Sequence, residues 1–250
     1  MTGRRPAWVA THQGKVRPSN EDCCAVANWQ SSGPVSTWQG RVPCHGGWAL
    51  VADGMGGHDA GDVASRIAVE ASAELIGRTS SEADIHHMLM IVNSRLFEAM
   101  YSGEGRPGMG TTIVGVLLVG SEALVFNIGD SRAYSLQGER LQQLTHDDSL
   151  TGQSRRSGHA ITQSLGGTTS RRPIHPHIEK VTLHRDATIL LCSDGLTDMI
   201  ADETILDILL RNKDQPAQGL LSAALDAGGR DNVTAVVIGH EVKHEDQRTT

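Results

Sequence analysis

The chain has 250 residues, with 22 Lys plus Arg against 29 Asp plus Glu, so its formal net charge at pH 7 is −7. This acidic balance argues against a nucleic-acid binder, and an aromatic content of 3% argues against base-stacking surfaces. The longest apolar runs, such as Ile113–Val119, fall far short of the ~20 residues that span a bilayer, and the N-terminal segment does not resemble a signal peptide. We therefore expect a cytoplasmic protein without membrane attachment.

The spacing of apolar residues predicts the secondary structure. Apolar side chains one turn apart indicate helices, and β-rich runs joined by Gly-containing turns indicate hairpins. In chain order we expect strands at 23–27 and 48–52, helices at 60–77 and 82–100, strands at 112–119, 123–127, 132–136, 140–144 and 188–192, helices at 202–211 and 216–227, and a strand at 233–238. Separate runs of strands and helices favour an α+β fold with helices covering antiparallel sheets. The absence of a Pro/Gly/Ser-rich linker predicts one domain over residues 1–239 and a polar tail at 240–250.

Acidic residues recur where an expected strand meets a loop: Glu21, Asp22, Asp53, Asp130, Asp194 and Asp231. Each alone is explained by ordinary turn chemistry. Gathered at one edge of a sandwich, they would repel one another by on the order of a kcal/mol per pair unless cations neutralise them. Oxygen ligands select Mg²⁺ or Mn²⁺, and the lack of a nearby Cys/His cluster disfavours zinc.

Two further residues complete this hypothesis. Gly54 follows Asp53, and without a Cβ its backbone carbonyl can approach a metal. Arg17 can grip phosphate oxygens with a two-pronged guanidinium, although a surface salt bridge is the alternative interpretation. Two metals and one arginine suit phosphoryl hydrolysis.

Seven segments occur in an order that resembles a known family. They are GKVRPSNED at 14–22, VADGMGGH at 51–58, GMGTT at 108–112, NIGDSRAY at 127–134, LTHD at 144–147, LCSDGLTD at 191–198 and DNVT at 231–234. Together they resemble the metal-dependent serine/threonine phosphatases of the protein phosphatase 2C type, in their bacterial form. The resemblance covers about residues 10–239 and implies an α-β-β-α sandwich of two antiparallel sheets flanked by helices.

The resemblance also implies roles for single residues. Asp53 would bridge two catalytic ions, Mn²⁺ or Mg²⁺; Asp194 and Asp231 would hold the first, the Gly54 carbonyl and Glu21 the second, with Asp22 supporting the cluster and Arg17 holding the phosphate. In bacterial members a third ion is often held by the residues that match Asp130 and Asp194, here with help from Asp198.

This sequence departs from the family pattern in two places. Met55 stands where many eukaryotic members have a histidine that protonates the leaving group; a metal-bound water is the expected acid here, and His58 is a weaker candidate. Between Asp148 and Ser164 there are 15 residues, ends excluded, where bacterial relatives insert a longer flap. The short segment puts substrate selection by a flap in question.

The resulting hypothesis is a phosphatase that hydrolyses phosphoserine and phosphothreonine in proteins and opposes a Ser/Thr kinase. We expect a monomer. Two alternatives stay open: a phosphatase for another phosphoester or a phosphorylated regulator, and a catalytically inactive phosphate-binding module. The second is disfavoured because Arg17, Asp53, Asp194 and Asp231 are all present.

Overall fold

The computed structural model describes residues 3–56, 60–150 and 161–240. Its elements are β1 (Arg4–His12), β2 (Asp22–Val26), β3 (Trp29–Gln30), β4 (Val35–Pro43), β5 (His45–Met55), α1 (Gly61–Ile76), α2 (Glu82–Ser102), β6 (Gly110–Thr111), β7 (Ile113–Val119), β8 (Glu122–Ile128), β9 (Arg132–Gln137), β10 (Arg140–Gln143), β11 (Leu165–Gly166), β12 (His177–Thr182), β13 (Thr188–Cys192), α3 (Asp194–Thr197), α4 (Asp202–Arg211), α5 (Pro216–Asp226) and β14 (Val233–Ile238).

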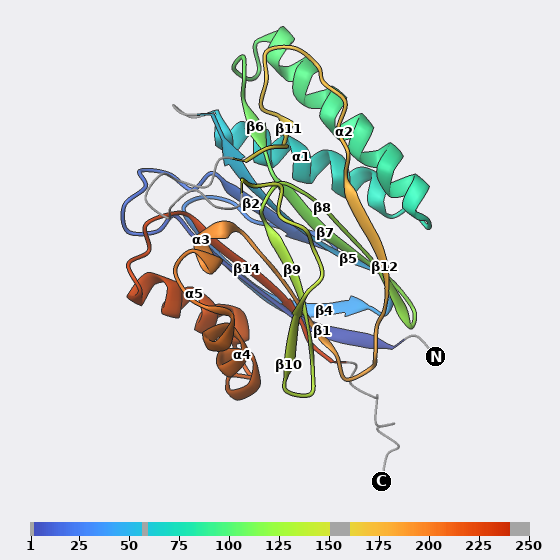
Figure 1. Cartoon of the computed structure of the whole chain (residues 1–250), viewed down its shortest axis with the longest axis vertical. Coiled ribbons are helices and arrows are strands. Elements are labelled where there is room, and N and C mark those ends of the chain that lie inside the picture. Colours follow the sequence, from blue (N-terminus) through green and yellow to red (C-terminus); the bar gives the residue numbers. More distant parts are fainter. Residues whose placement is uncertain (1–2, 57–59, 151–160, 241–250) are drawn as a thin grey trace.

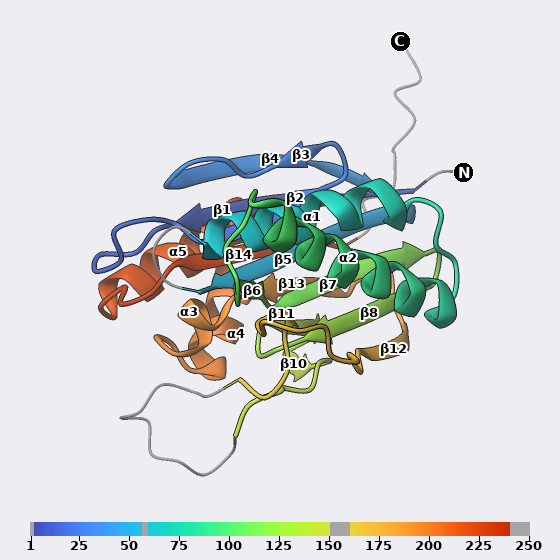
Figure 2. The same cartoon turned by 90° about the horizontal axis from the view of Figure 1, so that it is seen from above.

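The strands form two antiparallel sheets. One sheet has the order β10-β9-β13-β14-β1-β4; the other contains β11-β6-β5-β7-β8-β12, with β2 pairing β5 and β3 pairing β2. Helices α1 and α2 lie on one side of the two sheets and α4 and α5 on the opposite side (Figure 1). Figure 2 shows the same arrangement from above. The predicted α-β-β-α sandwich is confirmed.

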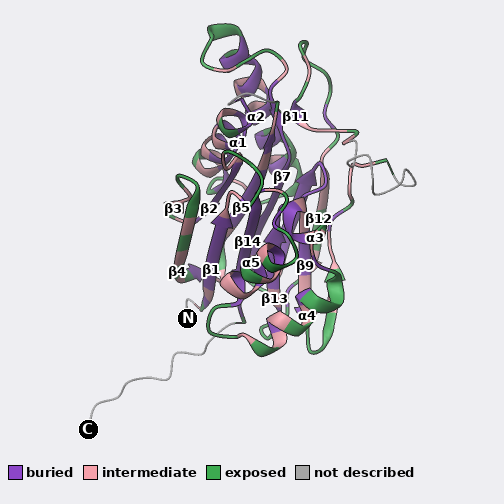
Figure 3. Ribbon diagram, turned by 90° about the vertical axis from the view of Figure 1, so that its left-hand side faces the viewer, coloured by how far each residue is buried: buried purple, intermediate pink, exposed green. Residues whose placement is uncertain are grey.

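Three apolar clusters hold these layers together. Aliphatic side chains such as Val51, Val116 and Val236 fill the space between the sheets. A second cluster joins α1 and α2 to the β5–β8 sheet, and a third joins α4 and α5 to the β9–β14 sheet. Most central strands are consequently buried, while α4 carries exposed residues on its outer side (Figure 3). Val and Ile suit these strands because branched side chains pack well on a pleated surface.

The predicted helices and hairpins are confirmed within one or two residues at each end. One boundary is wrong in a way that affects the site: the strand expected to end at residue 52 continues to Met55, so Asp53 and Gly54 lie inside β5 and not after it. Strands β1, β4 and β12 were not predicted from the sequence, and all of them pair fully with neighbouring strands. Among the described residues, no helix combines the length and apolar character that crossing a membrane requires.

Candidate active site

The strand pairing of β2 with β5 places two carboxylates opposite each other. Asp22 begins β2, and its partner across the antiparallel ladder is Asp53 in β5. Like charges at such a cross-strand position are destabilising by themselves. The pair is therefore a feature that the hydrophobic sandwich alone does not explain.

The other sheet contributes Asp194 and Asp231. Asp194 is the first residue of α3, which follows β13 after one residue, and Asp231 lies two residues before β14. These two segments are held together, because the backbone N–H of Ser193 donates to the carbonyl of Thr234 at 3.2 Å. A Cβ on Gly195 would lie 1.9 Å from the carbonyl oxygen of Asn232, so only glycine permits this approach. The ends of both sheets thus bring four aspartates to one place.

The charges of the other three carboxyl groups act on Asp53. The pKa of Asp53 is raised well above its ordinary value. Burial is the largest cause, and the charges of Asp22 and Asp194, a hydrogen bond between the Asp53 and Asp194 carboxyls, and the charge of Asp231 add to it. The structure therefore brings these four acids, which come from distant segments of the chain, close together.

Asp22 is buried and is held by two side-chain hydrogen bonds. Its side chain is buried, and its Oδ2 accepts hydrogen bonds from Ser193 Oγ at 2.8 Å and Thr234 Oγ1 at 2.6 Å. Burial is the main cause that raises its pKa to about 7, with those two hydrogen bonds opposing and the charges of Asp194 and Asp231 adding to the effect. The second oxygen, Oδ1, is buried without a hydrogen-bond partner among the described residues.

The backbone of Asp53 is held by two threonines. Its N–H donates to Thr112 Oγ1 at 3.0 Å, and its carbonyl accepts from the Thr111 hydroxyl at 2.8 Å and from the Thr112 N–H at 2.9 Å. Thr112 Oγ1 also shares a 2.8 Å hydrogen bond with Ser131 Oγ, next to Asp130. These contacts connect the central acid with the β8–β9 loop.

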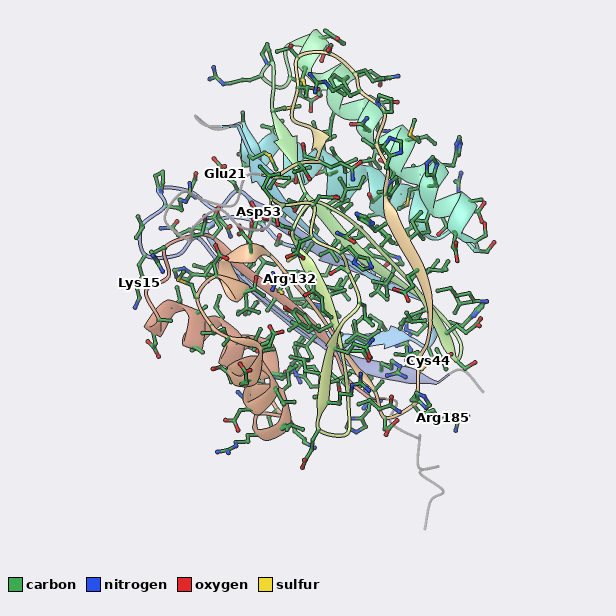
Figure 4. All side chains as sticks on the ribbon, in the orientation of Figure 1. Lys15, Glu21, Cys44, Asp53, Arg132 and Arg185 are labelled. Atoms are coloured by element: carbon green, nitrogen blue, oxygen red, sulfur yellow. The ribbon has the colours of Figure 1, made fainter. Side chains whose placement is uncertain are left out.

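Gly54, Gly61 and Glu21 pack against one another at the start of α1. A Cβ on Gly54 would lie 2.0 Å from the Gly61 carbonyl oxygen and 2.7 Å from that of Glu21. A Cβ on Gly61 would lie 2.3 Å from Glu21 Oε2. The two glycines therefore let the Glu21 carboxylate and the Gly54 backbone share the space near Asp53, and Figure 4 shows Glu21 and Asp53 close together at this end of the sandwich.

Arg17 lies at the same site, in contact with Asp231. Its Nη2 is 2.5 Å from Asp231 Oδ2, and its side chain remains 54% exposed. The pKa of Arg17 is raised, mainly by its hydrogen bond with Asp231 and further by the charges of Asp231, Asp53 and Glu21, while burial opposes the shift. The guanidinium is thus permanently charged and open to a further anion.

Asp130 lies beside Asp194 in a second acidic group. Its side chain is 6% exposed, and its Oδ1 is buried without a hydrogen-bond partner among the described residues. Burial, followed by the charge of Asp194 and smaller contributions from Asp147 and Asp198, raises its pKa to about 7. Asp198 is an exposed residue at the end of α3. Asp194 thus interacts with both acidic groups.

The residues present fit divalent cations. The donors are carboxylate and carbonyl oxygens, two of the buried carboxylates retain an oxygen without a hydrogen bond, and their mutual repulsion is what bound cations would neutralise. Within the described ranges, no three acidic, histidine or cysteine side chains already enclose a single point. The two Asp231 carboxylate oxygens accept hydrogen bonds from Arg17 Nη2 and from the Asn232 N–H.

The sequence analysis missed the residues that support the site. Asn232 accepts the N–H of Glu21 at 2.7 Å and donates to the carbonyls of Gln13 and Ser19, both at 2.8 Å, which fixes the loop that carries Arg17. Its position after Asp231 was the only available signal. The sequence shows the adjacency but not these long-range partners.

A second missed group supports the Asp130 loop. Arg132 binds Asp147 through Nε and Nη2, the latter at 2.6 Å from Oδ2. Asp148 accepts from the N–H of Gly129 and from Gln163, and pairs with His177 at 2.9 Å. From the segment after β10, Asp148 contacts the Gly129–Asp130 turn directly, and Asp147 contacts Arg132, two residues after Asp130. The candidate proton donor His58 lies outside the described residues.

The fold and the site together define a class of protein: a sandwich of two antiparallel sheets whose oxygen-only acidic centre and single arginine suit metal-dependent phosphate-ester hydrolysis. A model of the family described as protein phosphatase 2C matches residues 38–221. The chain belongs to the protein phosphatase 2C family.

Relatives and solved structures agree with this assignment. The serine/threonine phosphatase stp of Listeria welshimeri is 31% identical over 93% of this chain and 94% of its own length. The crystal structure of the Mycobacterium tuberculosis serine/threonine phosphatase PstP/Ppp superposes with a TM-score of 0.78, at 31% identity over 95% of this chain and all of that chain. The catalytic domain of PstP in complex with two manganese ions superposes with a TM-score of 0.76, at 31% identity over 96% of this chain and 100% of that one.

Proposed function

We propose that this enzyme, a metal-dependent protein-serine/threonine phosphatase, uses the four-aspartate centre at the ends of its two sheets to hydrolyse phosphoserine and phosphothreonine. The observation that carries the proposal is the meeting of Asp22 and Asp53 from one sheet with Asp194 and Asp231 from the other. Burial of several like charges is costly, and function is the usual reason that a protein retains them. The enzyme uses Mn²⁺ or Mg²⁺, as the family and the two-manganese structure indicate.

In this proposal the acids divide into three roles. Asp53 would contribute to both catalytic cation sites, Asp194 and Asp231 would hold one cation, and the Gly54 carbonyl and Glu21 would hold the other. Asp22 supports the cluster and is itself held by hydrogen bonds from Ser193 and Thr234. Asp130, with Asp194 and Asp198, would hold an accessory third cation. Bound divalent cations would lower the pKa of a water molecule and neutralise the charge of the phosphate.

The chain's own residues bind and orient the substrate. Arg17 is exposed enough to reach a phosphate, and its planar fork matches two phosphate oxygens. Asn232 keeps the Arg17 loop in place through the Gln13 and Ser19 carbonyls. The phosphate is therefore fixed by a charged side chain whose loop is tied to the same segment as Asp231.

Phosphorylated proteins are the substrates, as the named serine/threonine phosphatases among the relatives indicate. The proposal further pairs the enzyme with a Ser/Thr kinase, treats it as a monomer and places it in the cytoplasm. The thiols of Cys23, Cys24 and Cys192 support the location, because they are buried, outside any disulfide, and suited to a reducing compartment. The proposal also assigns residues 1–239 to one phosphatase domain.

The test compares two substrates, an aryl phosphate and a phosphothreonine peptide, with Mn²⁺ and with EDTA. We expect Mn²⁺-dependent hydrolysis of both and none in EDTA. Hydrolysis of the aryl phosphate alone would favour a phosphatase for other phosphoesters, and hydrolysis of neither would favour an inactive phosphate-binding module. Either result would contradict the proposal.

A further inference from the structure

A groove that includes many polar side chains lies beside Asp22, one of the four acids of the centre. It has a volume of about 670 Å³, and Asp22 and Asn20 lie at its boundary with the active site. One side consists of small residues in the loops at 18–20 and 31–34; the other is the N-terminal half of α1. This volume falls within the range of sites that bind organic ligands and exceeds what an ion needs.

The groove lies next to the proposed phosphate site, because Asp22 is among its lining residues. The loop that forms one of its walls also carries Arg17, and Ser65 on the opposite wall donates to the Glu21 carbonyl at 2.6 Å. A polypeptide whose phosphorylated side chain enters the acidic centre therefore has an adjacent channel for its flanking residues.

Charged side chains on α1 determine the charge of this groove. The α1 side chains that line it include Asp62, Arg66 and Glu70. Arg66 is 3.2 Å from Glu70 and 3.9 Å from Glu104, so two acids share its positive charge. Asp62 is exposed and adds a further negative charge. The α1 side chains that line the groove are thus two acids and one arginine, with a net charge of −1.

We propose that this groove binds the polypeptide segment beside the phosphorylated residue and selects substrates that carry Lys or Arg there. The proposal rests on the proposed phosphatase function and names the substrate class of that same site. Complementary charge at an exposed groove contributes modestly to affinity and mainly to selectivity, and salt weakens it.

The experiment measures kcat and KM for phosphothreonine peptides in which a single Arg is moved through each flanking position, against the same peptides with Ala. For the parent enzyme we expect a lower KM with Arg on one side of the phosphorylated residue, by about two- to five-fold. Asp62→Asn and Glu70→Gln should each reduce that preference with kcat unchanged, and Asp62→Lys should reverse it toward peptides with Glu at the same position. High salt should diminish the preference.

The control is Glu74→Gln, also on α1. Glu74 is exposed and pairs with Arg95 at 2.6 Å, away from the groove lining. Glu74→Gln should keep the parent preference. All variants should hydrolyse an aryl phosphate at the parent rate, because a molecule of that size, bound by its phosphate, does not extend into the groove.

The outcomes separate the two proposals. An enzyme active on the aryl phosphate and on peptides but indifferent to Arg, or a preference that survives Asp62→Lys, would overturn the groove proposal and leave the phosphatase function standing. A parent enzyme inactive on both substrates with Mn²⁺ would overturn the function, and the groove proposal with it.

Discussion

Gly54 offers a test of how tightly the end of β5 is packed against α1. In Gly54→Ala the new Cβ would lie 2.0 Å from the Gly61 carbonyl oxygen and 2.7 Å from the Glu21 carbonyl oxygen. Both neighbours are backbone atoms, and the Gly54 N–H is itself bonded to the Glu21 carbonyl at 3.2 Å. No side-chain rotation can relieve the overlap, so strand and helix must separate by about 1 Å or more at this point.

Overpacking of this kind costs about 3 kcal/mol. For a chain of this size that should lower Tm by about 6–12 °C. Since the separation also moves Glu21, the Tm increase on adding Mn²⁺ should shrink relative to the parent. Thermal unfolding in EDTA and in Mn²⁺, with calorimetric Mn²⁺ titration, measures both effects.

The matched control is Gly77→Ala at the end of α1. There φ is −66°, and a Cβ would meet nothing within 4 Å. We expect no loss of stability and a gain of up to about 1 kcal/mol, because alanine reduces the freedom of the unfolded chain. If Gly54→Ala kept both the parent Tm and the parent Mn²⁺ affinity, the close packing described for this site would be wrong.

Four other predictions concern the site. Arg17→Ala should lower kcat/KM for a phosphopeptide by about ten-fold or more, mainly through KM, because a charge-assisted phosphate contact of about 1.5–3 kcal/mol is lost; an unchanged kcat/KM would make Arg17 a surface residue. Asp194→Asn should reduce kcat far more than Asp130→Asn, and equal turnover of the two would contradict the assigned roles. Thiol alkylation of the native enzyme should spare activity, since burial raises the pKa of Cys192 to about 12; inactivation mapped to Cys192 would indicate a cysteine mechanism. In EDTA the free energy of unfolding should fall as pH rises from about 4 to about 7, because the raised pKa of Asp22 makes the folded state hold a proton that the unfolded state releases, and urea denaturation of Asp22→Asn should show a flatter profile.

Local patterns predicted the elements whose apolar period is uninterrupted. Helices α1 and α2 and the β7–β8 hairpin follow from such periods. Strand β1 did not, because Pro6 and two arginines interrupt its apolar pattern. Arg5 is nevertheless buried, since its guanidinium donates to the carbonyls of Ala187, His184 and Gly239. These partners come from distant parts of the chain, so no local pattern reveals them.

The sequence predicted which acids form the centre, but not the residues that hold those acids in place by hydrogen bonds. The motif acids were identifiable because each was expected where a strand meets a loop, and the structure brings Asp22, Asp53, Asp194 and Asp231 together, although Asp53 lies inside β5. The hydrogen bonds of Ser193 and Thr234 to Asp22 link residues more than 170 positions apart. Only the pairing of the strands specifies which residue meets which.

The central claim is that the acids around Asp53 hold the catalytic cations. Calorimetric titration of the metal-free chain with Mn²⁺, for the parent and for Asp53→Asn, tests it most directly. The account predicts at least two Mn²⁺ per parent chain and, in the variant, the loss of tight binding at both catalytic positions, because Asp53 is assigned to each of them. A variant that bound Mn²⁺ with the parent stoichiometry and affinity would contradict the claim.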